Sequence, residues 1–450
     1  MAVLDRIQTI AVVMMENRSF DHMLGHMSLP RFGGRRDIEG LEGRLDRKGR
    51  LRNGRYENPY RGDIYRPHLL EVDEPLPIDV PHERDAVTTQ MGDPGVTGAF
   101  PMNGFAAAYL ASDRMEAELD PKALGFFGPE QVPITRFLAD EYMVCDHWFS
   151  SIPTSTQPNR AIGLSGEAAI DRTKLQIIPA ESLVLDWLTD QGVRWRVYHD
   201  GLSFFVLFGP EWIDHDGFRS FDQLRQDITN EPEADAPEVL FIEPSYQSAP
   251  HLGADKPNDN HAPLPVRNGE HFLRQVYLAL TANEQKWAKT LLIVTYDEHG
   301  GFWDHVPPPT VRCEPPPHAH YSEPFTSMGP RVPTVLVSPF IQKGSVCQKR
   351  LDNTSILQLL AEKFGDGDYS ESVSRRRDQG DVQSVSAALD ERGRRPDIPS
   401  PPPAPGGALA AVNDLRSAGF DPGSEEVEWG FRRVAERYMK EHPARMRAKY

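Results

Sequence analysis

The chain has 450 residues, of which 39% are hydrophobic and 26% charged, and its formal net charge at pH 7 is −17. The length suits one large α/β domain with insertions, or two domains. The negative charge argues against a nucleic-acid partner, because binding a phosphate backbone needs a basic face. It also argues against electrostatic adsorption to anionic membranes. A phosphorylated substrate is still compatible with this charge, because a bound metal ion can supply local positive charge.

Three cysteines stand far apart in the chain, at Cys145, Cys313 and Cys347. Their odd number and wide spacing indicate neither a disulfide framework nor a metal motif, and they favour a reducing compartment. The sequence has no apolar run of about 18 residues that would predict a transmembrane helix. The apolar stretch 7–15 leads into Glu16 rather than into a small-residue cleavage site. We therefore expect a cytoplasmic protein, unless it is exported by a route that the sequence does not show.

The first predicted element is the apolar run at residues 7–15, which is typical of a strand buried on both faces of a parallel sheet. Further apolar runs predict strands at 193–198, 239–242, 290–296 and 332–337. The stretches between them predict helices at 134–142, around Pro158, at 183–191, 271–284 and 355–364. This alternation predicts an α/β fold with a doubly wound, mostly parallel sheet, flanked by helices and carrying long loop insertions.

Polar residues follow several of these predicted strands at the point where each strand ends, including His199 and Asp200 after 193–198 and Glu243 after 239–242. Glu16 and Asn17 follow the first strand, and Asp297 and Glu298 follow the strand at 290–296. Because ligands bind outside the carboxyl ends of strands in such sheets, we expect these side chains to converge. Carboxylate and amide oxygens suit a divalent cation such as Mg²⁺, Mn²⁺ or Ca²⁺. The alternative is a solvated acidic turn after each strand.

A threonine stands at the start of the predicted helix around Pro158. The free N–H groups of a first helical turn attract phosphate, and a metal ion beside the Thr156 hydroxyl would lower its pKa for attack on phosphorus. Thr154 and Ser155 are nearby hydroxyls that could take the same role. The alternative for Thr156 is an ordinary helix cap, because Ser and Thr are common N-caps.

Four motifs occur in order along the chain: Glu16-Asn17-Arg18-Ser19-Phe20-Asp21-His22, Thr156-Gln157-Pro158-Asn159-Arg160, Asp259-Asn260-His261-Ala262-Pro263, and the stretch 296–308. The first and last are long and distinctive, whereas the middle two are short. Together they resemble the phosphoesterase family of non-specific phospholipases C and acid phosphatases, within the alkaline-phosphatase-like superfamily. The resemblance runs from about Ile7 to about Phe364 and implies an alkaline-phosphatase-like α/β fold.

The resemblance also implies roles for single residues. It makes Thr156 the nucleophile and assigns metal binding to Glu16, Asn17, Asp297 and Glu298, with Mg²⁺, Mn²⁺, Ca²⁺ or Zn²⁺ as the ion.

Further polar residues are implied around the phosphate. Asn159 would contact the phosphoryl oxygens, and three histidines would surround them: His82, His199 and His261. One histidine would protonate the leaving oxygen and the others would bind the phosphate, whereas the alternative for each is a structural histidine. Asp304 and His305 would be second-layer partners that contact the metal ligands and orient them.

The family resemblance also suggests how the chain is divided. We expect residues 1–365 to form the phosphoesterase domain, with residues 30–130 as an insertion over the active site. Residues 366–450 are polar and then Pro-rich. They are expected to end in a helix at 425–440 that is packed on, or tethered to, that domain.

The function implied is hydrolysis of a phosphate ester, with a metal ion and a phospho-threonine intermediate. A phospholipase C that cleaves phospholipids at a transiently contacted membrane surface is the first hypothesis, and an acid phosphatase acting on soluble monoesters is the alternative. A catalytically silent binding protein of the same fold is a third hypothesis. The apolar segment 201–208 is either a loop that receives acyl chains or a buried part of the core.

Overall fold

A computed structural model describes residues 3–112, 115, 119–173, 177–209, 212, 215–247, 256–389 and 395–411. The predicted helix at 425–440 therefore lies outside the described residues. Within the described part, no helix has the length and apolar character that crossing a membrane requires.

The centre of the fold is an eight-stranded sheet with strand order β12-β6-β11-β10-β1-β9-β7-β8. Its strands are β1 (Thr9–Met15), β6 (Met143–Cys145), β7 (Trp195–His199), β8 (Phe218–Ser220), β9 (Val239–Glu243), β10 (Thr290–Tyr296), β11 (Val335–Val337) and β12 (Ser345–Cys347). Only β11 runs against the others, because it pairs antiparallel with both β10 and β6 while the remaining pairs are parallel. The predicted mostly parallel sheet is confirmed.

The two central strands β1 and β10 are continuous apolar runs that are buried along almost their whole length. Such runs suit strands covered on both faces, where no side is left for polar residues. The two strands pair in parallel from Thr9 opposite Thr290 to Met15 opposite Tyr296, so both end at the same level of the sheet. Their polar continuations therefore leave the sheet side by side.

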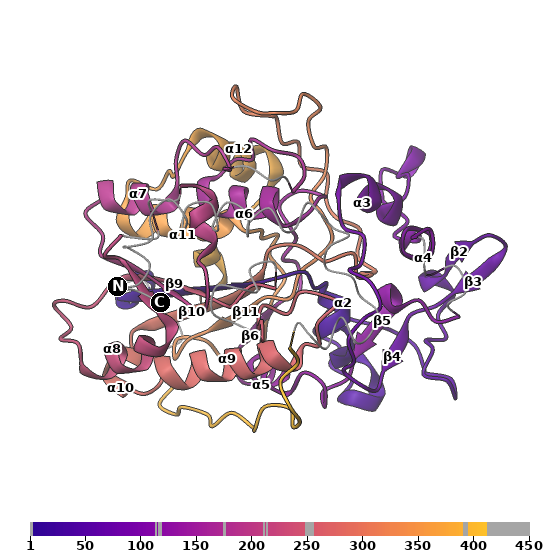
Figure 1. Cartoon of the computed structure of the whole chain (residues 1–450), viewed down its shortest axis with the longest axis horizontal. Helices are drawn as coiled ribbons and strands as arrows, with labels where there is room; N and C mark the ends of the chain where they lie inside the picture. Colours follow the sequence, from indigo (N-terminus) through magenta and orange to yellow (C-terminus); the bar gives the residue numbers. More distant parts are fainter. Residues whose placement is uncertain are drawn as a thin grey trace.

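Helices cover both faces of the sheet (Figure 1). On one face lie α6 (Thr156–Ser165), α7 (Val184–Asp190), α11 (Thr354–Phe364) and α12 (Glu371–Gly380). On the other lie α5 (Pro133–Glu141), α8 (Leu224–Asn230), α9 (Arg267–Leu280) and α10 (Glu284–Trp287). A short α1 (Val3–Arg6) precedes the first strand. The main hydrophobic core lies between the sheet and these helices, which confirms the predicted doubly wound arrangement.

A second body of structure lies beside one end of the sheet (Figure 1). It contains α2 (Phe20–Met23), β2 (Asn58–Tyr60), β3 (Asp63–Tyr65), β4 (His68–Leu70), α3 (Arg84–Met91), α4 (Phe105–Leu110) and β5 (Gly125–Phe127). Most of its buried apolar residues form a second core, which includes Phe302 and Trp303 of the loop after β10. The α2 residues Phe20 and Met23 pack in the main core instead. The inserted segment is thus packed directly on the loop that carries the candidate site.

Two segments outside the sheet also have a defined place. Residues 204–207 form a buried 3₁₀ turn in the main core, so the apolar stretch 201–208 is a core segment and not an acyl-chain loop. The Pro-rich residues 395–411 run along α9, where Tyr277 Oη donates to the Pro399 carbonyl at 2.8 Å and Arg274 Nε to the Pro402 carbonyl at 2.9 Å.

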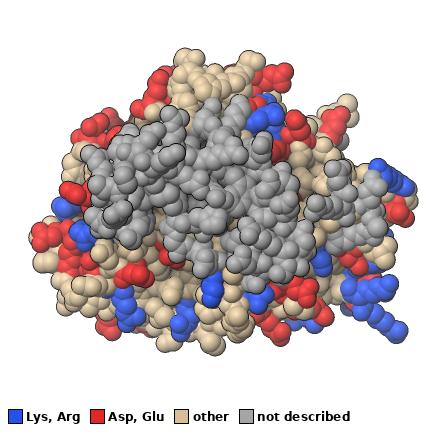
Figure 2. Space-filling model, viewed as in Figure 1, with Lys and Arg blue, Asp and Glu red and all other residues tan. Residues whose placement is uncertain are grey.

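The surface charge is mixed. On the described part of the face in Figure 2, basic side chains are interspersed with acidic ones.

Candidate active site

Asn17 is the residue on which the candidate site converges. It follows β1 in a left-handed conformation, with φ of 57°. Its backbone N–H donates to Asp297 Oδ1 at 3.1 Å and so joins the ends of β1 and β10. Its side-chain Oδ1 accepts from the Thr156 hydroxyl at 3.0 Å. Residues from three distant parts of the sequence therefore meet at the carboxyl edge of the sheet.

The glycine pair after β10 makes this contact sterically feasible. Gly300 and Gly301 have φ of 62° and 72°, a region that glycine adopts without strain. A Cβ on Gly300 would lie 2.2 Å from the Asn17 carbonyl oxygen, and one on Gly301 would lie 2.5 Å from the Pro81 carbonyl oxygen. The loop thus packs its bare backbone against Asn17 on one side and against the insertion on the other.

Three neighbouring hydroxyls differ in how accessible they are. Thr154 is buried and donates to the Asp171 carbonyl at 2.7 Å, and Ser155 is buried and donates to Glu83 Oε2 at 2.9 Å. Thr156 is only partly buried and is the first residue of α6, whose N-cap is Ser155. The Thr156 side chain is therefore not the N-cap of this helix, and its hydroxyl faces Asn17.

Carboxylates are unusually concentrated around Asn17. Glu16, Asp297 and Glu298 are each at most 2% exposed. Burial raises the pKa of Asp297 and of Glu298 to about 7, and the neighbouring Glu16 charge adds to the effect. Within the described residues, the buried Glu298 Oε1 has no hydrogen-bond partner. Excess negative charge and a spare oxygen fit a hard divalent cation, which takes oxygen ligands.

Arg160 supplies part of the positive charge that this cluster needs. It is 2% exposed, its Nε donates to Asp297 Oδ2 at 2.9 Å, and its Nη2 lies 3.4 Å from Glu16 Oε1. It also donates to the Met14 carbonyl at 3.1 Å. Sequence reasoning assigned no role to Arg160. The available signal was its spacing, because it stands one helical turn after Thr156 and so lies on the same face of α6.

Two of the three predicted histidines meet at Asn17. The Nε2 atoms of His82 and His261 lie 3.3 and 2.9 Å from Asn17 Nδ2. The other ring nitrogen of His261 lies 3.0 Å from Glu16 Oε2. His199 lies at the carboxyl end of β7, two strands away from β1, with its Nδ1 2.6 Å from the Gly201 carbonyl oxygen. The structure therefore brings His82 and His261 together and leaves His199 further along the same edge.

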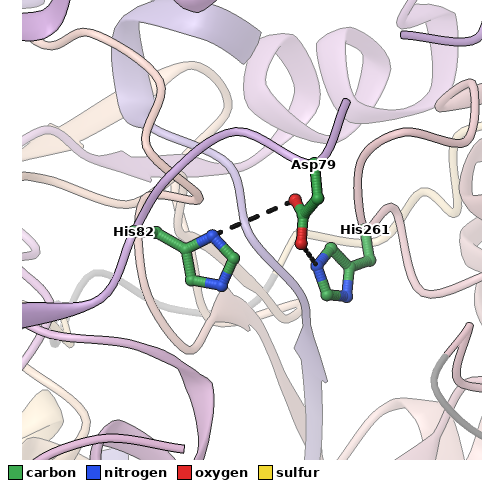
Figure 3. A group of neighbouring side chains, drawn as sticks. All are labelled: Asp79, His82 and His261. Atoms are coloured by element: carbon green, nitrogen blue, oxygen red, sulfur yellow. Dashed lines mark hydrogen bonds and ion pairs between the residues drawn. The ribbon is translucent and has the colours of Figure 1, made fainter. Parts of the chain in front are cut away.

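Two aspartates that sequence reasoning did not assign belong to this site. Asp79 Oδ2 lies 3.2 Å from His261 Nε2, and its Oδ1 lies 3.9 Å from His82 Nδ1 (Figure 3). Asp259 Oδ1 accepts from the His261 backbone N–H at 3.0 Å. The sequence signals were the position of Asp79 three residues before His82 and of Asp259 in the same motif as His261.

The structure contains acidic and histidine clusters that could hold a metal ion. Two of them share His261 and have one ligand atom per residue within 4.8 Å of the others: Asp79, His82 and His261, and Glu16, Asp259 and His261. Among the described residues, no such cluster combines Glu16, Asp297 and Glu298. The three predicted carboxylate ligands share one edge of the sheet, but their oxygens do not all lie within 4.8 Å of one another.

Asn159 holds the loop before α6. Its Nδ2 donates to the carbonyls of Ile152, Thr154 and Ser155 at 3.1, 2.8 and 3.1 Å, and its Oδ1 accepts from the Ile152 N–H at 3.0 Å. These bonds fix the turn that presents Thr156. Contact between Asn159 and a substrate stays a prediction.

That Asp304 and His305 orient the metal ligands stays a prediction, and their described partners lie elsewhere. Asp304 Oδ1 accepts from Arg331 Nε at 2.9 Å, and His305 Nδ1 lies 2.6 Å from Asp21 Oδ2. These side chains belong to a separate buried network around Arg331, because that guanidinium provides the counter-charge for both aspartates.

The model of the Phosphoesterase family matches residues 7–365 of this chain. The chain belongs to that family. The resemblance inferred from the four motifs is thereby confirmed.

Named relatives of this phosphoesterase are phospholipases C. It is 32% identical over 364 residues to non-specific phospholipase C1 of Arabidopsis thaliana, covering 76% of this chain and 62% of that protein. It is 28% identical over 434 residues to non-hemolytic phospholipase C of Burkholderia pseudomallei, covering 80% of this chain and 55% of that protein. The chain thus spans less than two thirds of the length of these relatives.

A solved structure of an alkaline-phosphatase-superfamily protein from Vibrio parahaemolyticus covers 53% of this chain and 62% of its own, at 13% identity and a TM-score of 0.29.

Proposed function

We propose that this phosphoesterase hydrolyses phosphate esters through a phospho-threonine at Thr156, with a bound divalent cation and with phospholipids as the first substrate class. The observation that carries the proposal is the Thr156 hydroxyl, which is partly exposed at the start of α6 and 3.0 Å from Asn17 Oδ1. Its neighbours Thr154 and Ser155 are buried and engaged in other bonds.

The cation would be held by Glu16, Asn17, Asp297 and Glu298, with Mg²⁺, Mn²⁺, Ca²⁺ and Zn²⁺ as candidates. The spare Glu298 Oε1 and the buried negative charge support this assignment. When bound, such an ion lowers the pKa of an adjacent hydroxyl and offsets the charge of the phosphoryl group.

The chain's own residues would carry out two displacements. Thr156 loses its hydroxyl proton to solvent as Oγ1 attacks phosphorus, and the substrate's ester oxygen takes up a proton and leaves as an alcohol. Water then attacks the phospho-threonine and restores the hydroxyl, releasing the phosphorylated head group of a phospholipid, or inorganic phosphate if the substrate is a monoester. Backbone N–H groups of the first turn of α6 hold the phosphoryl oxygens. His82 and His261, whose Nε2 atoms face Asn17, bind the phosphoryl group, and His199 further along the edge is the candidate donor of a proton to the leaving oxygen.

The relatives support a phospholipid as the substrate, since both are named phospholipases C. Contact with the membrane would then be transient, through the rim of the site. An acid phosphatase acting on soluble monoesters is the second candidate function, and a catalytically silent protein of this fold is the third.

The deciding experiment measures nitrophenol release from a chromogenic phosphate ester, with and without a chelator, by the wild-type protein and by Thr156→Ala. We expect release that stops on chelation and falls by several orders of magnitude in the variant. No release with any of the four cations would overturn the proposal. A panel of phosphatidylcholine vesicles and soluble phosphomonoesters then separates the two enzymatic functions, because a phosphatase leaves the vesicles intact.

A further inference from the structure

A short hairpin in the insertion, residues 44–52, presents several basic side chains to solvent. Leu45 pairs antiparallel with Leu51, and the Arg52 N–H donates to the Arg44 carbonyl at 2.9 Å. Four residues of the hairpin are both exposed and basic: Arg44, Arg47, Lys48 and Arg52. Within the described residues, none of these four side chains has an ion pair or a hydrogen bond. The hairpin therefore offers four cations that no described carboxylate contacts.

The other two charged residues of the hairpin hold its shape. Asp46 Oδ1 accepts from the backbone N–H groups of Lys48 and Arg50 at 2.8 and 3.0 Å, which closes the turn. The Arg50 guanidinium donates to both carboxylate oxygens of Asp120, at 2.7 and 3.1 Å. On the inner side, Leu51 is buried in the core of the insertion. The hairpin is thus anchored on one face, and its remaining cations extend into solvent.

Two of the exposed arginines stand opposite each other. Because Leu45 pairs with Leu51, Arg44 and Arg52 form the next cross-strand pair of the hairpin. Side chains alternate along a strand, so both arginines point away from the face that carries the leucines. Like charges directly opposite each other in a strand pair are destabilising. An anion lying across the two guanidinium groups would remove that repulsion.

The local charge of this region is opposite to that of the chain. Residues 31–66 contain eleven Lys and Arg but only six Asp and Glu, whereas the whole chain carries −17. The net charge argues against an anionic surface, but charges more than about 8 Å apart are largely screened at physiological ionic strength, so the local charge decides what this region attracts. Figure 2 shows basic side chains projecting at the lower right, the side on which Figure 1 places the insertion.

Exposed aliphatic side chains border the hairpin. Leu119, which is 80% exposed, directly precedes the aspartate that binds Arg50. Val72, which is 61% exposed, is three residues after Leu69, whose N–H donates to a carbonyl of the hairpin at 2.9 Å. Cations beside exposed aliphatic side chains suit an anionic bilayer, which offers both negative head groups and an apolar boundary. A nucleic acid would attract the cations but offers no apolar phase.

We propose that the hairpin 44–52 docks the protein on an anionic phospholipid surface, with Val72 and Leu119 entering the head-group region at its border. The choice of a lipid surface rests on the proposed function, because a phospholipase C has to reach phospholipids in a bilayer. Each Lys or Arg near such a surface strengthens binding about 5-fold, so four cations give reversible adsorption rather than permanent attachment.

The experiment measures sedimentation of the full chain with two kinds of vesicle, one of phosphatidylcholine alone and one of phosphatidylcholine mixed with phosphatidylserine. A chelator is present throughout, so that the proposed hydrolysis cannot alter the vesicles and docking is measured apart from catalysis. We expect binding to the mixed vesicles at about 0.1 M salt, loss of that binding at about 1 M salt, and little binding to phosphatidylcholine alone.

Two double variants locate the surface. Arg44→Gln with Arg52→Gln removes the opposed pair, and Arg225→Gln with Lys289→Gln is the matched control. Arg225 in α8 and Lys289 just after α10 are surface cations at the end of the molecule away from the insertion (Figure 1). Both double variants remove two positive charges, so the net charge of the chain changes equally. We expect the hairpin variant to bind mixed vesicles about 30-fold more weakly and the control to bind like the wild-type protein.

Equal binding of the hairpin variant and the wild-type protein to the mixed vesicles would overturn the inference, as would binding that salt does not weaken. Binding of a DNA duplex in place of the mixed vesicles would make the partner a nucleic acid and would also overturn it. The proposed function fails separately: a protein that sediments with the mixed vesicles but hydrolyses no ester would refute the hydrolysis and leave the docking surface in place.

Discussion

Arg160 and Asp297 form a fully buried ion pair that joins helix α6, which begins at Thr156, to the end of β10. Arg160 Nε lies 2.9 Å from Asp297 Oδ2, and their side chains are 2% and 0% exposed. Thr156 contacts Asn17 from the same helix, one turn earlier. One face of α6 is therefore attached to the ends of both central strands, and a shift of α6 would move the Thr156 hydroxyl and the buried carboxylates together.

Replacing Arg160 should be strongly destabilising. Arg160→Met keeps most of the side-chain volume but leaves Asp297 and Glu16 without their counter-charge, which costs about 3–5 kcal/mol when a buried pair is broken. The measurement is urea unfolding of the variant against the wild-type protein. Lys289→Met is the control, since the Lys289–Glu233 pair is on the surface and such pairs contribute at most about 1 kcal/mol. Equal losses in the two variants would contradict the role given to Arg160.

We expect the hydroxyl of Thr156 to be needed for the reaction, and those of Thr154 and Ser155 to be needed only for stability. Thr156→Ala removes the attacking oxygen and should lower turnover by several orders of magnitude with little loss of stability. Thr154→Ala and Ser155→Ala remove buried hydrogen bonds and should cost about 1 kcal/mol each while the reaction continues. Turnover and melting temperature of the three variants decide the matter. A Thr156→Ala protein that turns over normally would show that the nucleophile has been misassigned.

A divalent cation should stabilise the folded protein, because its proposed ligands reach one edge of the sheet only on folding. At a cation concentration 100 times its Kd the gain is about 2.7 kcal/mol, which a thermal melt detects as a higher Tm. Glu298→Gln should lose most of this shift, because it removes the charge of the side chain with the spare oxygen. Glu243→Gln is the control. Glu243 is also buried with a spare oxygen, at the end of β9, but it is outside the predicted ligand set. Equal shifts in the two variants would exclude Glu298 as a ligand.

We expect His147, which lies outside the candidate site, to make the stability of the fold depend on pH. Hydrogen bonds to Asp146 and Glu39 raise the pKa of His147 from 6.5 to about 9. A raised histidine pKa stabilises the fold fully below pH 6.5, and this contribution is lost as the pH rises from 6.5 through 9. Because Glu39 is half-exposed, we expect a loss of about 1–2 kcal/mol.

The measurement for His147 is the free energy of unfolding of the wild-type protein minus that of His147→Gln, at pH 6 and pH 9.5. The difference cancels other groups that titrate in the same range. A difference that does not shrink toward high pH would mean that His147 is not held as a cation.

The central strands could be predicted from the sequence because each is a long apolar run bounded by polar residues. The predicted strand 290–296 coincides with β10. The three-residue strands β6, β8 and β12 were missed, because so short a segment has no periodicity to detect. The reversed direction of β11 was also missed, because an apolar run looks the same in either direction and its pairing is set by tertiary contacts.

The site residues that directly follow a predicted strand could be predicted from the sequence. The contacts between distant loops could not. Asn17 and Asp297 come together because β1 and β10 end at the same level, which the two apolar runs already implied. Asp79 and His261 are 182 residues apart, and only the packing of the insertion brings them into contact. The segment 201–208 left two interpretations open, because apolar composition alone does not distinguish a core segment from a lipid-facing loop.

The close approach of Gly300 to Asn17 gives a test of how tightly the two strand ends are coupled. Gly300→Ala would put a Cβ 2.2 Å from the Asn17 carbonyl oxygen, so either the loop or Asn17 must move. Gly98→Ala is the matched control, because Gly98 has a similar φ of 71° and nothing within 4 Å of its Cβ position. The control should cost about 1–2 kcal/mol from the left-handed backbone alone.

Gly300→Ala adds the steric overlap to that backbone cost, so we expect a total of about 2–5 kcal/mol. It should also lower turnover, because displacing Asn17 moves the amide that holds Thr156 on one side and faces the two histidines on the other. Urea unfolding and kcat of the two variants are the measurements. If Gly300→Ala behaved like Gly98→Ala in both, the loop after β10 would be free to shift without disturbing Asn17, and the site would be less rigidly coupled than its contacts indicate.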